Sequence, residues 1–531
     1  MSDSSSDTQN FGWIRALIWP VHRHELKKLI PMLLLFFFVF FNYNVLRIMK
    51  DTLVVTAKSS GAEVIPYIKT YVMLPAAFLM TFVFTRLANR FSREVVFYVM
   101  ISSFLIYFFL FAFFLYPNHE LIHPNELADS LQASLPAGFK GLIAVFRNWT
   151  FTLFFVISEL WQNIVLFVLV WGFANQVTRL NEAKRFYGLF GFGANFSGIF
   201  AGLISVYLCQ GGYNSRLPFG RTDWEQTLII LVSLVIFSGI LSMLLIRWMY
   251  KNVLSDSRYY DYKDAQEDKA VRGKLSIRES FSYILNSKYL IYITLLVVFY
   301  NIVNNLTDIV WKNQLNELYP NPRDFSLYAY KVSTVIGIVA TFSALIVSGN
   351  ALRKCGWTFT AMITPCILIV MAIGFFGLFF FKEHLSMFVM SLFGTTPLAL
   401  VVFVGAFQNV LNRGAKYTVF DATKEMAFVT LPGEWKLKGN SVIDGVSNRF
   451  GEFGACSLQT VLLGMFATLP ASAPYIATIL FFVFAGWIVT VWLLGKEFNL
   501  LTSGKNVQPS EAERIVEPER RKTVIAEQQA I

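Results

Sequence analysis

The chain has little charge and few cysteines for its length. Only 15% of its 531 residues are charged, whereas soluble domains usually have about 25%. Its four cysteines show no paired spacing, which argues against a disulfide framework or a cysteine-based metal site. G-x-x-x-x-G-K-[ST] does not occur, so the phosphate loop of an ATPase is missing. H-E-x-x-H occurs once, at His119–His123, in a stretch that we expect to be an external loop. We therefore expect no metal, no cofactor and no catalytic residue.

Apolar residues, in contrast, are abundant. They make up 55% of the chain, 54 of them are Phe, and the mean hydropathy is +0.52. A soluble protein of this length has too little interior to hide that much apolar surface, so we expect it to lie in a lipid bilayer. The net charge of +11 is then interpreted as the excess of Lys and Arg on the cytoplasmic side of a membrane protein. We expect no nucleic-acid partner.

The hydrophobic runs have the length of membrane spans. A transmembrane helix needs about 20 mostly apolar residues, and twelve segments meet this requirement. They cover roughly residues 29–49, 64–86, 95–116, 147–174, 186–208, 226–249, 288–311, 327–348, 358–381, 387–412, 440–467 and 472–495. The sequence therefore predicts an all-α integral membrane protein with about twelve transmembrane helices.

Polar segments divide the chain into two halves. A solvated loop over residues 250–287 separates a six-helix half at 29–249 from a second one at 288–495. Two six-helix halves joined in this way are typical of major-facilitator-type transporters, whose substrate site lies between the halves. The distribution of Lys and Arg predicts that the polar ends, residues 1–28 and 496–531, are both cytoplasmic. Residues 1–28 lack the apolar core and cleavage site of a signal peptide.

Several ionisable residues lie inside the hydrophobic segments. Such residues are costly in a membrane and usually mark function. They include Arg47, Lys50, Glu159, Asp308, Lys312, Asp444, Arg449 and Glu452. Glu159 has apolar-dominated sequence on both sides, so its alternatives are a functional carboxylate or a buried ion pair between helices. Arg47 and Lys50 lie near a helix end, where snorkelling to the interface would also explain them.

The mixture of signs suits a carrier of polyphosphates. Arg47, Lys50 and Arg449 can replace the hydration of phosphate groups. Glu159 and Asp308 can hold those cations when the site is empty, or carry protons. The neighbouring Asn42 and Tyr43 offer an amide and an aromatic face of the kind that binds a nucleobase. A carrier of another organic anion, and a flippase or membrane enzyme for a lipid- or nucleotide-linked substrate, remain as alternatives.

The sequence resembles the ATP/ADP translocase family of nucleotide transporters, in particular its chlamydial-type members. The resemblance runs from about Trp19 to Lys496 and rests on the segments WPVHRHELKKLIPM, FFNYNVLRIMKDTLVVT, SGAEVIPYIK, RNWTFTLFFVISELW, WGFANQVTRLNEAKRFYGLFGFGAN and KYTVFDATKEMAFV. It implies alternating access without hydrolysis, with ATP exchanged for ADP and phosphate. Some members take other nucleoside triphosphates, sometimes with protons.

Charged positions of the family match this chain only in part. Lys50 and Glu159 stand where the exchangers have Lys and Glu, while Asp308 replaces a Glu, and Asn440 and Glu452 each replace a Lys. This pattern has less positive charge, so it should bind a triphosphate less strongly unless protons or other residues compensate. We expect a ribonucleotide carrier of the bacterial inner membrane, either an exchanger with broad specificity or a proton symporter.

Overall fold

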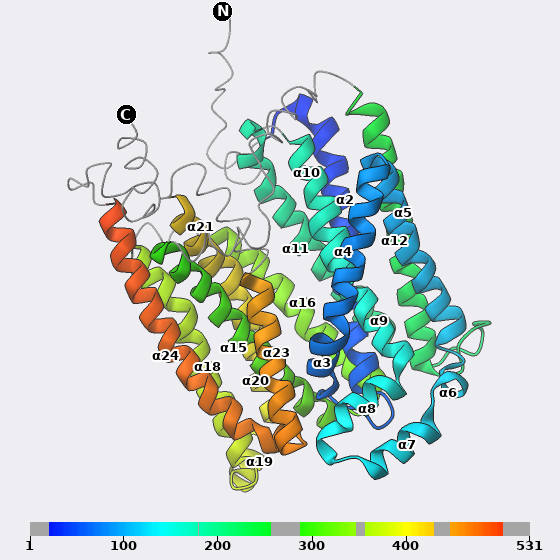
Figure 1. The fold of residues 1–531 in the computed structure, drawn as a ribbon, viewed down its shortest axis with the longest axis vertical. Helices are drawn as coiled ribbons and strands as arrows, with labels where there is room; N and C mark the ends of the chain where they lie inside the picture. The colour runs from blue at the N-terminus through cyan, green and yellow to red at the C-terminus, as the bar shows by residue number, and fades with distance from the viewer. Residues whose placement is uncertain (1–20, 179, 256–286, 347–355, 430–446, 503–531) are drawn as a thin grey trace, which may run out of the picture.

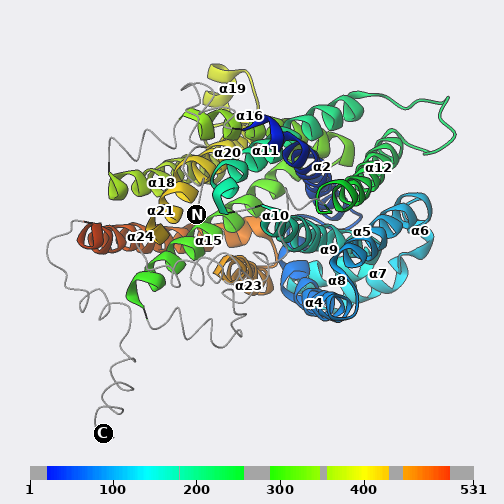
Figure 2. The same cartoon turned by 90° about the horizontal axis from the view of Figure 1, so that it is seen from above.

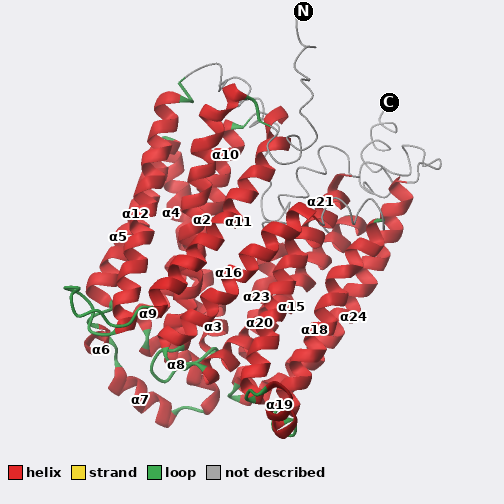
Figure 3. Ribbon diagram, turned by 180° about the vertical axis from the view of Figure 1, so that it is seen from behind, coloured by secondary structure: helices red, strands yellow, loops and turns green. Residues whose placement is uncertain are grey.

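The computed structural model describes residues 21–178, 180–255, 287–346, 356–429 and 447–502. Within these ranges every regular element is a helix, as Figure 3 shows. Eleven of the helices are long and apolar enough to cross a membrane. Helix α23, Asn448–Phe466, falls in the remaining predicted segment, whose first residues lie outside the described ranges. The predicted all-α membrane fold is confirmed.

The N-terminal half contains six spans, several of which include a π-helical turn. Helix η1 (Arg23–Glu25) leads directly into the first span, whereas the short helices α6 (His119–Ile122), α7 (Asn125–Ser134), η4 (Ala137–Phe139) and α8 (Lys140–Arg147) lie outside the spans. The spans are α2 (Leu26–Val55); α3 (Val64–Tyr67) with η2 (Ile68–Val72) and α4 (Met73–Arg90); α5 (Arg93–Leu110) with η3 (Phe111–Leu115); α9 (Trp149–Leu160) with η5 (Trp161–Val170) and α10 (Trp171–Val177); α11 (Leu180–Gln210); and α12 (Asp223–Asn252).

The C-terminal half has a similar composition. Its helices are α15 (Lys288–Leu318), α16 (Pro322–Ile346), α18 (Trp357–Phe381), α19 (Ser386–Phe393), α20 (Pro397–Ala415) with η6 (Lys416–Phe420) and α21 (Asp421–Val429), α23, and α24 (Leu469–Thr502). Figures 1 and 2 show the two halves side by side, with α2, α11 and α16 where they meet. Helices α6, α7, α8 and α19 lie at the end of the molecule opposite the last turn of α24.

The tenth span differs from the predicted segment 387–412. Its first residues form the separate helix α19, which ends at Gly394 in the left-handed conformation with φ +62°. Helix α20 then begins at Pro397, and the Thr396 hydroxyl accepts a hydrogen bond from the Ala399 amide. A left-handed glycine ends a helix, and a Thr cap followed by Pro begins one. Hydropathy does not detect this break because both helices are apolar.

The two halves approach most closely where α11 packs on α16. A Cβ atom at Gly202 of α11 would lie 2.1 Å from Thr334 Oγ1 and 3.2 Å from Thr334 Cα on α16. A Cβ at Gly337 of α16 would lie 3.2 Å from Ile199 Cγ1. Membrane helices use such small residues to bring their backbones together, because lipid supplies no hydrophobic force between them. These glycines therefore set the spacing of the two halves.

We expect Gly202→Ala to lower the melting temperature of the purified protein, because the added methyl group must displace Thr334 and the α16 backbone. Overpacking of this kind costs about 1–3 kcal/mol. Gly191→Ala is the matched control on the same helix, since a Cβ there would meet no atom within 4 Å. That change should leave the melting temperature equal or higher. Equal melting temperatures for the two variants would contradict this account of the interface.

Candidate functional site between the two halves

A buried ion-pair network begins on α2. Lys50 Nζ lies 2.9 Å from Asp51 Oδ1 and 2.9 Å from Glu159 Oε1 of α9. The ammonium also lies 3.9 Å from the centre of the Phe155 ring, one turn before Glu159. The side chain of Lys50 is only 7% exposed. The predicted cation and the predicted carboxylate are thus brought together, in surroundings where neither would be stable alone.

The network continues across the interface to the C-terminal half. Lys312 Nζ of α15 lies 2.8 Å from Asp51 Oδ2 and 2.6 Å from Asp308 Oδ2, which is one turn earlier on α15. Asp51 therefore binds one lysine from each half. The five residues form a chain of alternating charge, with three carboxylates and two ammonium groups, from Glu159 to Asp308.

Sequence reasoning did not identify Asp51 as a site residue. The signal was present, because Asp51 is an ionisable residue followed by the apolar run Leu53–Val55. It directly follows Lys50, however, and two adjacent residues of opposite charge suggest an ion pair that needs no further partner. The bond to Lys312 depends on how α2 and α15 meet, which no local pattern reports.

Other polar contacts join the halves beside this network. Arg47 donates to Ser333 Oγ of α16 over 3.3 Å, and Arg449 of α23 donates to Asn163 Oδ1 of η5. Lys69 of η2 lies 2.5 Å from Glu452 Oε1 of α23. Glu452 therefore forms an ion pair instead of adding an isolated negative charge to the site.

The two weaker candidates of the sequence lie differently. Tyr43 is half-buried, with the Arg47 guanidinium carbon 5.9 Å from its ring centre. Asn42 is fully buried and donates to the Val235 carbonyl of α12 over 3.0 Å, so its amide is used within the N-terminal half. Asn440 and Asp444 lie outside the described residues.

One arginine binds both halves at the end of the molecule where α6 to α8 lie. Arg323, in the first turn of α16, donates to three carbonyls at the end of α11: Cys209 at 2.7 Å, Gln210 at 3.1 Å and Gly211 at 2.8 Å. Its other nitrogen lies 2.5 Å from Asp223 Oδ2 at the start of α12. The last carbonyls of a helix carry partial negative charge and lack helical partners, so a guanidinium satisfies them well.

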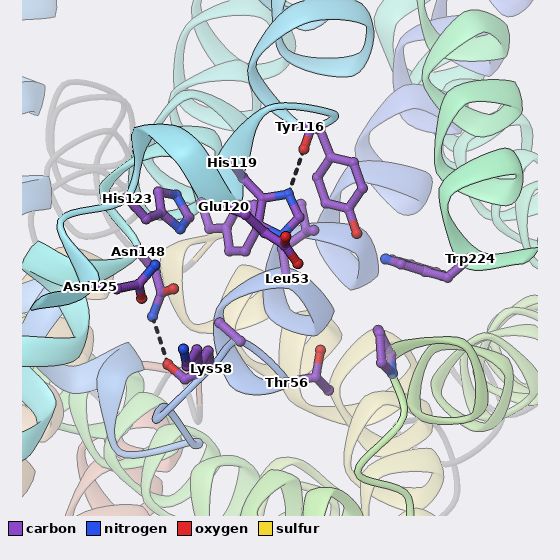
Figure 4. A pocket seen from close by; sticks show the side chains of 13 residues that line it. Leu53, Thr56, Lys58, Tyr116, His119, Glu120, His123, Asn125, Asn148 and Trp224 are labelled. Atoms are coloured by element: carbon purple, nitrogen blue, oxygen red, sulfur yellow. Dashed lines mark hydrogen bonds between the residues drawn. The ribbon is translucent and has the colours of Figure 1, made fainter. Parts of the chain in front are cut away.

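A cavity of about 490 Å³ opens at the same end of the molecule, apart from the ion-pair network. Figure 4 shows His119, His123, Asn148 and Lys58 around it. Its lining residues are Leu53, Thr56, Ala57, Lys58, Tyr116, His119, Glu120, His123, Asn125, Asn148, Phe151, Trp224 and Pro322. The His123 ring nitrogen Nε2 lies 2.6 Å from Thr150 Oγ1.

Comparisons with known proteins identify the family. The family model described as TLC ATP/ADP transporter matches residues 4–498. The chain belongs to this family. It is 42% identical to ADP,ATP carrier protein 1 of Chlamydia pneumoniae, over 93% of this chain and 96% of the relative. It is 38% identical to ADP,ATP carrier protein 1 of Rickettsia bellii, over 95% and 99%. The chloroplastic ADP,ATP carrier protein 2 of Arabidopsis thaliana is 39% identical, over 92% and 78%.

Solved structures confirm the predicted major-facilitator-like fold of this TLC family member. An inward-facing bacterial homologue of the iron transporter ferroportin matches with a TM-score of 0.53 and 12% identity, over 91% of this chain and 99% of that one. The inward-open xylose transporter XylE from E. coli matches with a TM-score of 0.52 and 12% identity, over 92% and 99%. At these identities the likeness concerns the fold alone.

We expect His123 to make the protein less stable in mild acid. Burial, and to a smaller extent the neighbouring His119, lowers the pKa of His123 to about 4 from an ordinary value of 6.5. Between these values the unfolded chain binds a proton that the folded chain does not, so stability is complete above pH 6.5 and is lost as the pH falls toward 4.

Melting temperatures at pH 7.5 and 5 measure this effect. Between pH 7.5 and pH 5 the melting temperature of the wild type should fall further than that of His123→Gln. His384→Gln, at an exposed loop position, is the control and should behave like the wild type. Equal losses in all three proteins would show that His123 does not carry the effect.

Proposed function

We propose that this chain exchanges adenine nucleotides across a bacterial inner membrane by alternating access, with both termini in the cytoplasm. The observation that carries the proposal is the Lys50 ammonium held between Asp51 and Glu159 and linked through Asp51 to Lys312 of the other half. The names of the chlamydial, rickettsial and chloroplastic relatives support ADP and ATP over another organic anion or a flippase substrate.

Competition for the lysines explains transport in physical terms. Phosphate oxygens form charge-assisted hydrogen bonds to ammonium groups, as carboxylates do. A bound nucleotide would take Lys50 and Lys312 from Asp51 and so remove the link between the halves. The carboxylates would reclaim the lysines when the nucleotide leaves. Binding would then favour a change of state through its different contacts in the two states, which is what coupling requires.

The same competition favours exchange over one-way transport. An empty carrier that reorients must separate Asp51 from Lys312 within the membrane, and breaking a buried pair is strongly unfavourable because it leaves uncompensated charges. A loaded carrier has phosphate groups to compensate the lysines. We therefore propose that the return step requires a second nucleotide, or phosphate, at the site.

Proton symport is the second candidate function, because the ion-pair network has an unbalanced negative charge that a proton could neutralise. The network has one carboxylate more than it has lysines. A proton on Glu159 or Asp308 would balance the charge while leaving both lysines paired. In that mode the proton would accompany the nucleotide inward, with other nucleoside triphosphates as further substrates.

Uptake of labelled ATP, ADP, GTP, CTP and UTP into intact bacterial cells that express the chain tests the function. We expect ATP and ADP uptake to rise when the cells are preloaded with ADP and to persist with a proton uncoupler. Abolition by the uncoupler would instead establish proton symport. Lys50→Gln should reduce uptake at least about tenfold, whereas Lys382→Gln, in an exposed ion pair with Glu317, should leave it unchanged. No uptake of any nucleotide by the membrane-inserted wild type would refute the proposal.

The variant Asp51→Asn should convert exchange into leak. It removes the ion pair between Asp51 and Lys312 but leaves Lys50 paired with Glu159 and Lys312 paired with Asp308. Proteoliposomes loaded with labelled ADP should then lose it into nucleotide-free buffer, whereas wild-type vesicles should retain it until ATP is added outside. Glu317→Gln is the control for an exposed carboxylate. Retention by the Asp51→Asn vesicles, with exchange intact, would contradict the proposed role of Asp51.

A further inference from the structure

Two cations of the C-terminal half are absent from the network described above. Arg413 lies in the last turns of α20, and Lys416 begins η6, one turn further along. Both side chains are half-buried within the span Pro397–Phe428. We infer that Arg413 and Lys416 form a second cationic subsite, which binds the terminal phosphates of the nucleotide. This inference rests on the proposed function and deepens it.

Neighbouring side chains on α20 fix the direction in which Arg413 points. Asn412 donates to Asn304 Oδ1 of α15 over 2.7 Å. A Cβ at Gly414 would lie 3.2 Å from Val339 Cγ1 of α16. Successive residues of a helix point about 100° apart, so Arg413 points between α15 and α16. Both of those helices contact α2 of the N-terminal half, and Arg413 therefore faces the junction of the halves.

The electrostatic surroundings of Arg413 agree with this direction. Tyr43 of α2 and Asp308 of α15 both lie within electrostatic range of the Arg413 guanidinium. Asp308 is already bonded to Lys312. Among the described residues, Arg413 forms no hydrogen bond and no ion pair. A guanidinium within a membrane is costly, so one that has no bonded carboxylate among the described residues is suited to receive an anion from the substrate.

Aromatic rings hold Lys416 close by. Its ammonium lies 5.3 Å from the centre of the Tyr300 ring and 5.8 Å from that of Tyr417. Ring faces attract a cation without neutralising it, and in the described part of the chain no carboxylate lies within ion-pair distance of Lys416. Arg413 and Lys416 are three residues apart, which places their side chains on neighbouring positions of one helix face.

The charge of the substrate requires cations of this kind. Lys50 and Lys312 are outnumbered by the carboxylates that hold them, so the network alone offers no net positive charge to a polyphosphate. Arg413 and Lys416 add two positive charges at the same junction. The planar guanidinium of Arg413 can bind phosphate oxygens in a bidentate manner. The subsite therefore favours nucleoside triphosphates and diphosphates over monophosphates.

Equilibrium binding of ATP, ADP and AMP to the purified full-length protein tests the inference. We expect Arg413→Gln to weaken ATP binding about ten- to hundredfold, as expected for the loss of a hydrogen bond between charged groups, and to weaken AMP binding much less. Lys416→Gln should act in the same direction, and Arg413→Lys should restore part of the affinity. Arg86→Gln, at an exposed position of α4, is the matched control.

The possible outcomes separate the two proposals. If the wild type binds nucleotides and neither Arg413→Gln nor Lys416→Gln changes the preference for ATP over AMP, the subsite is refuted while the proposed function stands. Equal loss for ATP, ADP and AMP would also refute it, because a merely structural role predicts no dependence on phosphate number. If Arg413→Gln lowers the melting temperature, its binding data no longer test the subsite. The preference for ATP over AMP in Arg413→Lys and Lys416→Gln then decides whether the subsite exists. A wild type that binds no nucleotide overturns the proposed function and this inference together.

Discussion

One carboxylate, that of Asp51, bonds to a lysine from each half of the molecule, at 2.9 Å to Lys50 and 2.8 Å to Lys312. Charges this deeply buried must remain paired, because their desolvation is compensated only by close partners. When α2 and α15 separate, a new anion or a new cation must therefore replace the partner that each group loses. A polyphosphate is such an anion, and it can dissolve in water until it reaches the site. An ion pair that links the two halves thus also determines what kind of ligand can separate them.

The remaining contacts between the halves differ in how easily they can be replaced. The α11–α16 contact at Gly202 and the Arg323 contacts to three carbonyls rely on backbone atoms, so they fix the register of the halves. The contacts of Arg47 with Ser333 and of Arg449 with Asn163 join a cation to a neutral acceptor. Phosphate is a stronger acceptor than a hydroxyl or an amide. These two arginines can therefore exchange partners, whereas the helix packing persists.

The sequence predicted what depends on local chemistry. Runs of apolar residues marked the spans, and the cost of intramembrane charge marked Lys50, Glu159 and Asp308. The pairs Lys50–Glu159 and Asp51–Lys312 join segments more than 100 residues apart and depend on helix rotation. They were therefore not predictable, and neither was the hydrogen bond from Asn42 to the Val235 carbonyl. Arg413 was missed for a different reason. The predicted tenth span ended at residue 412, because the polar residues that follow reduce hydropathy although the helix continues through η6 and α21.

The effect of a charged residue on the site depends on its ion-pair partner. Asp308 bonds to Lys312 on its own helix, so the link across the interface falls to Asp51. Glu452 is neutralised by Lys69, and the negative charge that the sequence seemed to add does not oppose a phosphate. The positive charge that a polyphosphate needs can then come from the proposed subsite of Arg413 and Lys416. A change of charge at one position therefore predicts substrate preference only when its ion-pair partner is known.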